Sequence, residues 1–251
     1  MSAEVSVDSQ RRLGIILLDS SHYTTSFLHC EPGDPGPGLL PLGYWECPAT
    51  WPVPSTYTVA RGATPSAVIG GDPGALAGVQ RASGLLEPRC SMVIADCGFF
   101  FSFATSLTQP SRLVTTLHLL DLATTAAGRR PVVVLTYDAR AAATLLRDHP
   151  TRRRLHFLGL DSLSTWQELG SEDWALRVRD GAALLRFELV QRLEQSDVRE
   201  LADQAGAVLV ECTLLSPLID DIRGAFPGLP LFDLAALVRI LLSGRSTAQP
   251  S

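Results

Sequence analysis

The sequence of 251 residues contains no lysine and no asparagine, so all 21 of its basic residues are arginines. The missing lysine excludes enzymes that depend on a lysine amine, such as pyridoxal-phosphate enzymes and Schiff-base aldolases. It also excludes Walker-type phosphate loops and protein kinases, which need a lysine to bind phosphate. The chain must therefore carry any chemistry on other residue types.

Basic charge, long apolar runs and paired cysteines are scarce as well. The net charge is −5 at pH 7, and no basic surplus favours a nucleic acid partner. No run reaches the roughly 18 apolar residues of a membrane span. The five cysteines are odd in number and include no CxxC pair, which argues against a disulfide framework and a structural metal site. We therefore expect a cytoplasmic protein without metal, nucleic acid or membrane partners.

Apolar strands alternate with amphipathic helices along the chain. Apolar residues make up 46% of the sequence, enough for a full core. Seven of the 17 prolines fall within 30–56 and predict a long loop, of the kind that often forms a lid or a binding loop. Strands are predicted at 13–18, 57–60, 92–95, 131–136, 155–160 and 207–210, and helices at 72–86, 139–147 and 172–205 with one break near Asp180-Gly181. This alternation predicts an α/β protein with parallel sheets flanked by helices.

The two halves of the chain repeat one another. Residues 12–19 align with 130–137 at an offset of 118, and residues 93–97 align with 208–212 at an offset of 115. The second alignment matches Cys97 with Cys212. Two similar α/β lobes of about 115 residues are therefore predicted.

Each half places an acid and a cysteine where a buried strand ends, at Asp96-Cys97 and Glu211-Cys212. Ligands of open α/β sheets bind outside the carboxyl ends of the strands, so two facing lobes would put Cys97 and Cys212 on opposite walls of one cleft. One thiolate could then remove a proton from a carbon while the other thiol delivers a proton to the opposite face. Thiols suit this task because their ordinary pKa is about 8.5 and a following helix N-terminus favours the anion.

A simpler interpretation of both cysteines remains open. Free cysteines are commonly small buried apolar side chains without a reactive role. The matched positions in the repeat favour the catalytic interpretation. Strand alternation would turn Asp96 and Glu211 to the opposite face, so we expect these two acids to be structural.

These residues resemble the aspartate/glutamate racemase superfamily, which includes hydantoin racemases, maleate isomerases and arylmalonate decarboxylases. The resemblance implies two pseudo-symmetric lobes, 13–112 plus 230–251 and 113–229, with the active site in the cleft between them. It implies cofactor-independent racemisation or epimerisation by Cys97 and Cys212 at a carbon next to a carboxylate or carbonyl, and it allows for a homodimer. The motifs that carry it lie at 13–20, 48–50, 57–59, 62–64, 96–98, 114–116, 135–137, 210–213 and 229–233.

The substrate-binding residues predicted with this resemblance surround the two cysteines. They are Asp19, Ser20, Thr50, Gly98, Phe99, Thr115, Thr116, Thr136, Tyr137 and Thr213. Two departures bear on specificity. Glutamate racemases follow the second cysteine with Thr-His, but here it is followed by Thr213-Leu214, and residues 99–101 are all phenylalanine. We therefore expect a substrate with an apolar or aromatic part rather than a simple α-amino acid.

Three alternative functions stay open at this point. A decarboxylase of the superfamily uses one cysteine, on the second-lobe side, and the retention of Cys97 speaks against it. A cis-trans isomerase that forms a covalent cysteine adduct is a further possibility. A ligand-binding accessory protein of a biosynthetic route that kept the fold and lost turnover is the third, because a fold alone does not imply activity.

Overall fold

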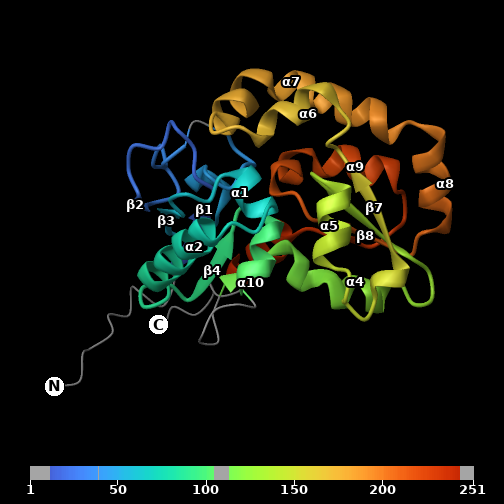
Figure 1. The fold of residues 1–251 in the computed structure, drawn as a ribbon, viewed down its shortest axis with the longest axis horizontal. Helices are drawn as coiled ribbons and strands as arrows, with labels where there is room; N and C mark the ends of the chain where they lie inside the picture. Colours follow the sequence, from blue (N-terminus) through green and yellow to red (C-terminus); the bar gives the residue numbers. More distant parts are fainter. Residues whose placement is uncertain (1–11, 39, 105–112, 244–251) are drawn as a thin grey trace, which may run out of the picture.

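Residues 12–38, 40–104 and 113–243 are described by a computed structural model, which contains two mainly parallel sheets (Figure 1). The first sheet has the strand order β2-β3-β1-β4-β5 and the second has the order β7-β6-β8-β9. The strands are β1 (Leu13–Leu17), β2 (Phe27–Cys30), β3 (Ser55–Val59), β4 (Met92–Ala95), β5 (Leu113–Val114), β6 (Val132–Thr136), β7 (Leu155–Gly159), β8 (Ala207–Val210) and β9 (Leu231–Phe232).

Helices flank both sheets, as α/β architecture requires. In the first half α2 packs on β1 and β3, and in the second half α4 packs on β8 and α5 on β7. The α-helices are α1 (Pro65–Ile69), α2 (Pro73–Leu86), α3 (Phe101–Ala104), α4 (Leu120–Ala126), α5 (Ala139–Leu145), α6 (Ser164–Gln167), α7 (Trp174–Leu193), α8 (Ser196–Gln204), α9 (Ile219–Ala225) and α10 (Leu234–Ser243). The 3₁₀ helices are η2 (Pro48–Thr50), η3 (Gly98–Phe100), η4 (Thr116–Leu119), η5 (Arg152–Arg154), η6 (Glu168–Gly170) and η7 (Thr213–Leu218). The predicted fold class is confirmed.

The central strands are continuous apolar runs because both of their faces are covered. Every residue of β1, β6 and β8 is buried, as expected for parallel strands between two helical layers. Helix α2 begins where the sequence predicted, with Asp72 as its N-cap and Pro73 in the first turn. Among the described helices none is long and apolar enough to cross a membrane.

The predicted break near Asp180-Gly181 is wrong. Helix α7 runs unbroken through Gly181, and the chain breaks instead at Gln195, the extended N-cap of α8. A glycine inside a helix costs only about 1 kcal/mol relative to alanine. The buried side chains of Val178 and Leu185 on either side of Gly181 hold the helix against the core.

The internal repeat is real, but its register differs from the sequence alignment by one residue. Ile16 pairs with Ala95 in the first sheet, and Leu135 pairs with Val210 in the second. Leu135 therefore takes the place of Ile16, an offset of 119 rather than 118. Apolar strand residues are nearly interchangeable, so the sequence could not fix the register. The extra strand β2, antiparallel to β3, has no counterpart beside β7.

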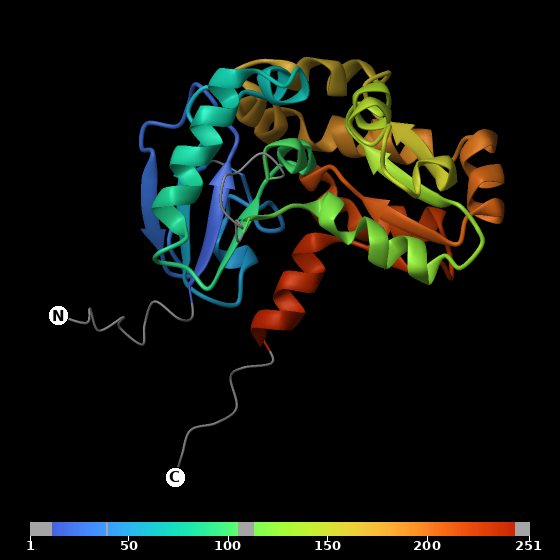
Figure 2. The same ribbon diagram turned by 60° about the horizontal axis from the view of Figure 1, so that its bottom comes forward.

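The two halves are tied together by helices and by the C-terminal segment (Figure 2). Strand β9 pairs with β8 in the second sheet, and helix α10 follows it directly. On α10, the Nε of Arg239 donates to the backbone oxygen of Thr50 at 3.1 Å. Helix α10 thus contacts the first half, while the lobe boundaries at 112/113 and 229/230 stay a prediction.

Candidate active site

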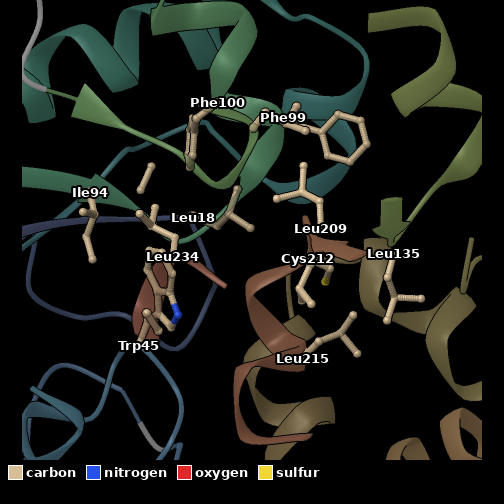
Figure 3. Packing of buried hydrophobic residues seen from close by; sticks show 14 of the residues in the cluster. Leu18, Trp45, Ile94, Phe99, Phe100, Leu135, Leu209, Cys212, Leu215 and Leu234 are labelled. Carbon is tan, nitrogen blue, oxygen red and sulfur yellow. The ribbon is translucent and has the colours of Figure 1, made fainter. Parts of the chain in front are cut away.

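A narrow cavity with about 40 Å³ of space for water-sized groups lies where the central strands of both sheets end. Its walls come from both halves of the chain and are mostly apolar. The lining residues are Leu18, Pro65, Ile69, Asp96, Cys97, Gly98, Phe99, Tyr137, Leu169, Trp174, Glu211, Cys212, Thr213 and Leu214. Figure 3 shows Leu18 and Phe99 of the first half near Cys212 of the second.

Both predicted catalytic cysteines line this single cavity. Cys97 follows β4 and caps η3, and Cys212 follows β8 and caps η7. Cys97 is partly exposed, whereas Cys212 is 8% exposed. The equivalent strands β4 and β8 therefore bring one thiol from each half to a shared space.

Asp96 and Glu211 also line the cavity, so the expectation that they face away from it is wrong. Each stands one residue beyond the end of its strand, and the cavity lies at these strand ends, so the acid and the cysteine that follows it both reach the lining. The backbone N–H of Leu18 donates to Asp96 Oδ1 at 2.9 Å, and Thr136 Oγ1 donates to Glu211 Oε2 at 2.6 Å. Both carboxyls are thus held beside the thiols.

Burial and the two neighbouring acids raise the pKa of both cysteine thiols. Burial raises the pKa of Cys97 well above its usual range, and the charges of Glu211 and Asp96 raise it further. Burial and Glu211 likewise raise the pKa of Cys212, while the backbone N–H groups of Leu214 and Leu215 oppose the rise. Both cysteines are therefore held as neutral thiols at neutral pH.

The carboxyls are themselves displaced toward their neutral forms. Burial raises the pKa of Glu211 to about 7, against the hydrogen bond from Thr136. Burial also raises the pKa of Asp96 well above its usual range, with a further contribution from the charge of Glu46. A carboxylic acid kept neutral in an apolar site can donate a hydrogen bond to an anion. The cavity can thus offer acidic donors although no arginine or histidine is among its described lining residues.

Four of the ten predicted substrate-binding residues line the cavity: Gly98, Phe99, Tyr137 and Thr213. Gly98 is tightly enclosed, since a Cβ there would lie 2.1 Å from Glu211 Oε1. Thr213 Oγ1 donates to the backbone oxygen of Asp96, which joins the second half to the first at the cavity wall. These residues remain predicted, not demonstrated, substrate contacts.

The other six predicted residues are not part of the lining. Asp19 accepts from Arg61 Nη1 at 2.7 Å and from the Gly62 N–H at 2.8 Å. Ser20 Oγ donates to the backbone oxygen of Glu172. The remaining four make internal contacts: Thr50 to Tyr44, Thr115 to His118, Thr116 to the backbone oxygen of Glu211, and Thr136 to the Glu211 side chain.

The sequence interpretation missed the apolar walls of the cavity. Leu18, Pro65, Ile69, Leu169, Trp174 and Leu214 supply them. Trp174 is the first residue of α7, and its indole Nε1 donates to the backbone oxygen of Asp19 at 3.1 Å. Nothing in the local pattern of α7 distinguishes this tryptophan from an ordinary core residue. Among the described residues, no three His, Cys, Asp or Glu side chains gather as a metal-binding group.

The raised pKa of Glu211 predicts a pH dependence of stability. A carboxyl whose pKa is higher in the folded state stabilises the fold at low pH, and this contribution is lost as pH rises through the folded pKa. Relative to Glu211→Gln, the wild type should lose about 3 kcal/mol of unfolding free energy between pH 4.5 and pH 8. Urea unfolding of both proteins at several pH values measures this difference. The exposed variant Glu194→Gln should show a flat difference, and a flat difference for Glu211→Gln would contradict the assignment.

Comparison with known proteins finds a solved structure that is similar to this chain over nearly its whole length, but no matching protein family. No protein-family model matches it, and no curated protein matches it. Among solved structures, the chain is similar to a glycine-to-cysteine mutant of arylmalonate decarboxylase in its sulfate-associated form. The sequence identity is 15%, the match covers 96% of this chain and 97% of that one, and the TM-score is 0.49.

Proposed function

We propose that the protein is a cofactor-independent racemase or epimerase that inverts a carbon next to a carboxylate or carbonyl. The observation that supports this proposal is the presence of Cys97 and Cys212, from equivalent strand ends of the two halves, in the lining of one cavity. Inversion of a carbon acid needs a base on one face and an acid on the other. Two cysteines from two similar lobes meet this requirement.

The proposed reaction moves one proton off the carbon and another onto it. The thiolate of one cysteine takes the α-proton, and the C–H electron pair moves into the adjacent carbonyl to give an enolate or enediolate. The thiol of the other cysteine then donates its proton to the opposite face and becomes the thiolate. For the other enantiomer Cys97 and Cys212 exchange roles.

Asp96 and Glu211 would couple substrate binding to thiol ionisation. Their charges, together with burial, oppose a thiolate in the cavity. An anionic substrate favours the neutral forms of both acids, which can then donate hydrogen bonds to it. The proton that neutralises Glu211 would come from a cysteine thiol in the same lining, which becomes the thiolate base.

Decarboxylation is the second candidate, and the apolar lining favours it. A carboxylate placed against Leu18, Ile69 and Leu214 loses its hydration without gaining a cationic partner. Loss of carbon dioxide relieves that cost and leaves a carbanion that one thiol can protonate. This reaction needs a single cysteine, so it leaves the second one without a role.

Wild-type turnover in deuterium oxide separates these possibilities. Single enantiomers of 2-arylpropionates and an arylmethylmalonate serve as probes, followed by NMR, chiral chromatography and carbon dioxide release. A racemase incorporates deuterium at the α-carbon and inverts it without releasing gas. Carbon dioxide release from the malonate alone would replace the proposal by the decarboxylase. Binding without exchange or release would overturn both and favour the accessory protein.

A further inference from the structure

A second cavity adjoins the cysteine cavity on the side of the proline-rich loop. It has about 20 Å³ of space for water-sized groups, and it shares Leu18, Asp96, Trp174, Thr213 and Leu214 with the first cavity. Its other walls are loop residues Leu40, Tyr44, Trp45 and Glu46. We call this second cavity the loop compartment. A ligand in the cysteine cavity lies next to it, because the two spaces have a common wall.

Glu46 brings a buried carboxyl to the loop compartment. The residue is 2% exposed, and its Oε1 accepts a hydrogen bond from the Tyr23 hydroxyl. Its Oε2 is buried beside Gly38 and has no hydrogen-bond partner among the described residues. A buried acceptor without a partner destabilises the fold, and more so when it is charged. An incoming donor would recover that cost.

The titratable groups around Glu46 carry no positive charge to balance it. Tyr23 follows β1, Asp96 follows β4, and Tyr44 belongs to the same loop. The ring of His22 lies tilted against Tyr23, with ring centroids 4.1 Å apart, and His22 is not among the residues that line the compartment. The adjoining part of η7 contributes only Thr213 and Leu214.

Aromatic walls add to the preference for a cation. Tyr44, Trp45 and Trp174 line the compartment together with the two carboxyls. Aromatic faces attract ammonium groups, most strongly when the cation is desolvated. The buried acid Glu46, which has no counterion, and three aromatic rings form a site that suits a protonated amine.

We propose that the loop compartment binds a protonated amine carried on the apolar part of the substrate, with Glu46 as its acceptor. This inference rests on the proposed function, because it names the substrate class of the same site. The substrate is then a carbon acid whose reacting carbon faces Cys97 and Cys212 while its ammonium group lies beyond Leu18 and Trp174.

Binding of a cation beside Glu46 should change the protonation of this carboxyl, and that change can be measured. Burial raises the pKa of Glu46 to about 7. A bound cation stabilises the carboxylate and lowers that pKa, so binding below pH 7 must release a proton. Affinity for the amine should therefore increase as pH rises toward 7 and level off above it.

Calorimetric titration with two matched probes tests the inference. The probes are 4-(aminomethyl)phenylacetate and its neutral counterpart 4-(hydroxymethyl)phenylacetate. At pH 7.5 the wild type should bind the amine at least tenfold more tightly than the alcohol. Glu46→Gln should abolish this preference, whereas Glu31→Gln, which removes one charge from an exposed side chain of the same loop, should retain it. Equal binding of the two probes by the wild type would overturn the inference.

Proton release provides a second readout that needs no variant, should Glu46→Gln fail to fold. Titrations of the wild type with the amine at pH 6, in two buffers of different ionisation enthalpy, should show a release approaching one proton per site. Zero release would overturn the inference. Exchange in deuterium oxide separates its failure from that of the proposed function. Amine-selective binding without exchange contradicts only the proposed reaction, whereas equal exchange of both probes contradicts only the amine site.

Discussion

Replacing either Cys97 or Cys212 by serine is expected to lower racemisation by roughly 10²–10⁴-fold, the usual contribution of a general acid or base. Both thiols line the same cavity, and the proposed inversion uses one on each face of the carbon. A serine hydroxyl is far less acidic than a thiol and cannot replace it as a base. Racemisation rates measured from each pure enantiomer test this prediction.

The matched control for both variants is Cys47→Ser. Cys47 is partly exposed and belongs to the proline-rich loop, outside the lining of the cysteine cavity. This variant should keep wild-type activity. A Cys97→Ser protein that still inverts both enantiomers would contradict the two-thiol reaction. Carbon dioxide release that depends on Cys212 and not on Cys97 would identify the one-cysteine decarboxylase.

Gly98→Ala is expected to destabilise the protein by about 1–3 kcal/mol, the usual cost of overpacking a core, and to remove most of its activity. A Cβ at this position would lie 2.1 Å from Glu211 Oε1 and 2.5 Å from Thr116 Oγ1. Both side chains are buried and hydrogen bonded within the wall between the halves. The glycine therefore permits the two halves to approach at the cavity.

Chemical denaturation and turnover together test the Gly98→Ala prediction. Gly84→Ala is the control, because an alanine Cβ at this exposed helical position would meet no atom within 4 Å. That variant should be unchanged or slightly more stable, since alanine favours helix. A Gly98→Ala protein with wild-type stability and activity would contradict this prediction, because Glu211 and Thr116 would then be able to move away from the added Cβ.

Much of the fold could be predicted because its signals are local. Strand β4 and strand β8 have the predicted bounds, since short apolar runs next to turn residues mark buried strands. The matched acid and cysteine after each of them indicated a shared site. The predicted alignment of β1 with β6 was wrong by one residue, because valine, leucine and isoleucine are nearly interchangeable inside a buried strand.

The rest of the site depends on contacts between distant segments. Asp19 accepts hydrogen bonds from Arg61 and Gly62, which are 42 and 43 residues away in the sequence. No local sequence pattern predicts this pairing. Asp96 and Glu211 line the cavity together with the cysteines that follow them, because the cavity lies at the ends of their two strands. Glu46 belongs to an irregular loop, where neither period nor spacing identifies a buried acid.

Helix α7 spans the two halves, and Figure 1 shows it running along one side of the molecule. Its 20 residues give a length of about 30 Å. Near its start Trp174 donates to the backbone oxygen of Asp19, and further along Arg186 pairs with Asp221 of α9 at 2.9 Å. Trp174 also lines both cavities. The fluorescence of the Trp174 indole should therefore change when a ligand binds in either cavity, so ligand binding can be followed without an added label.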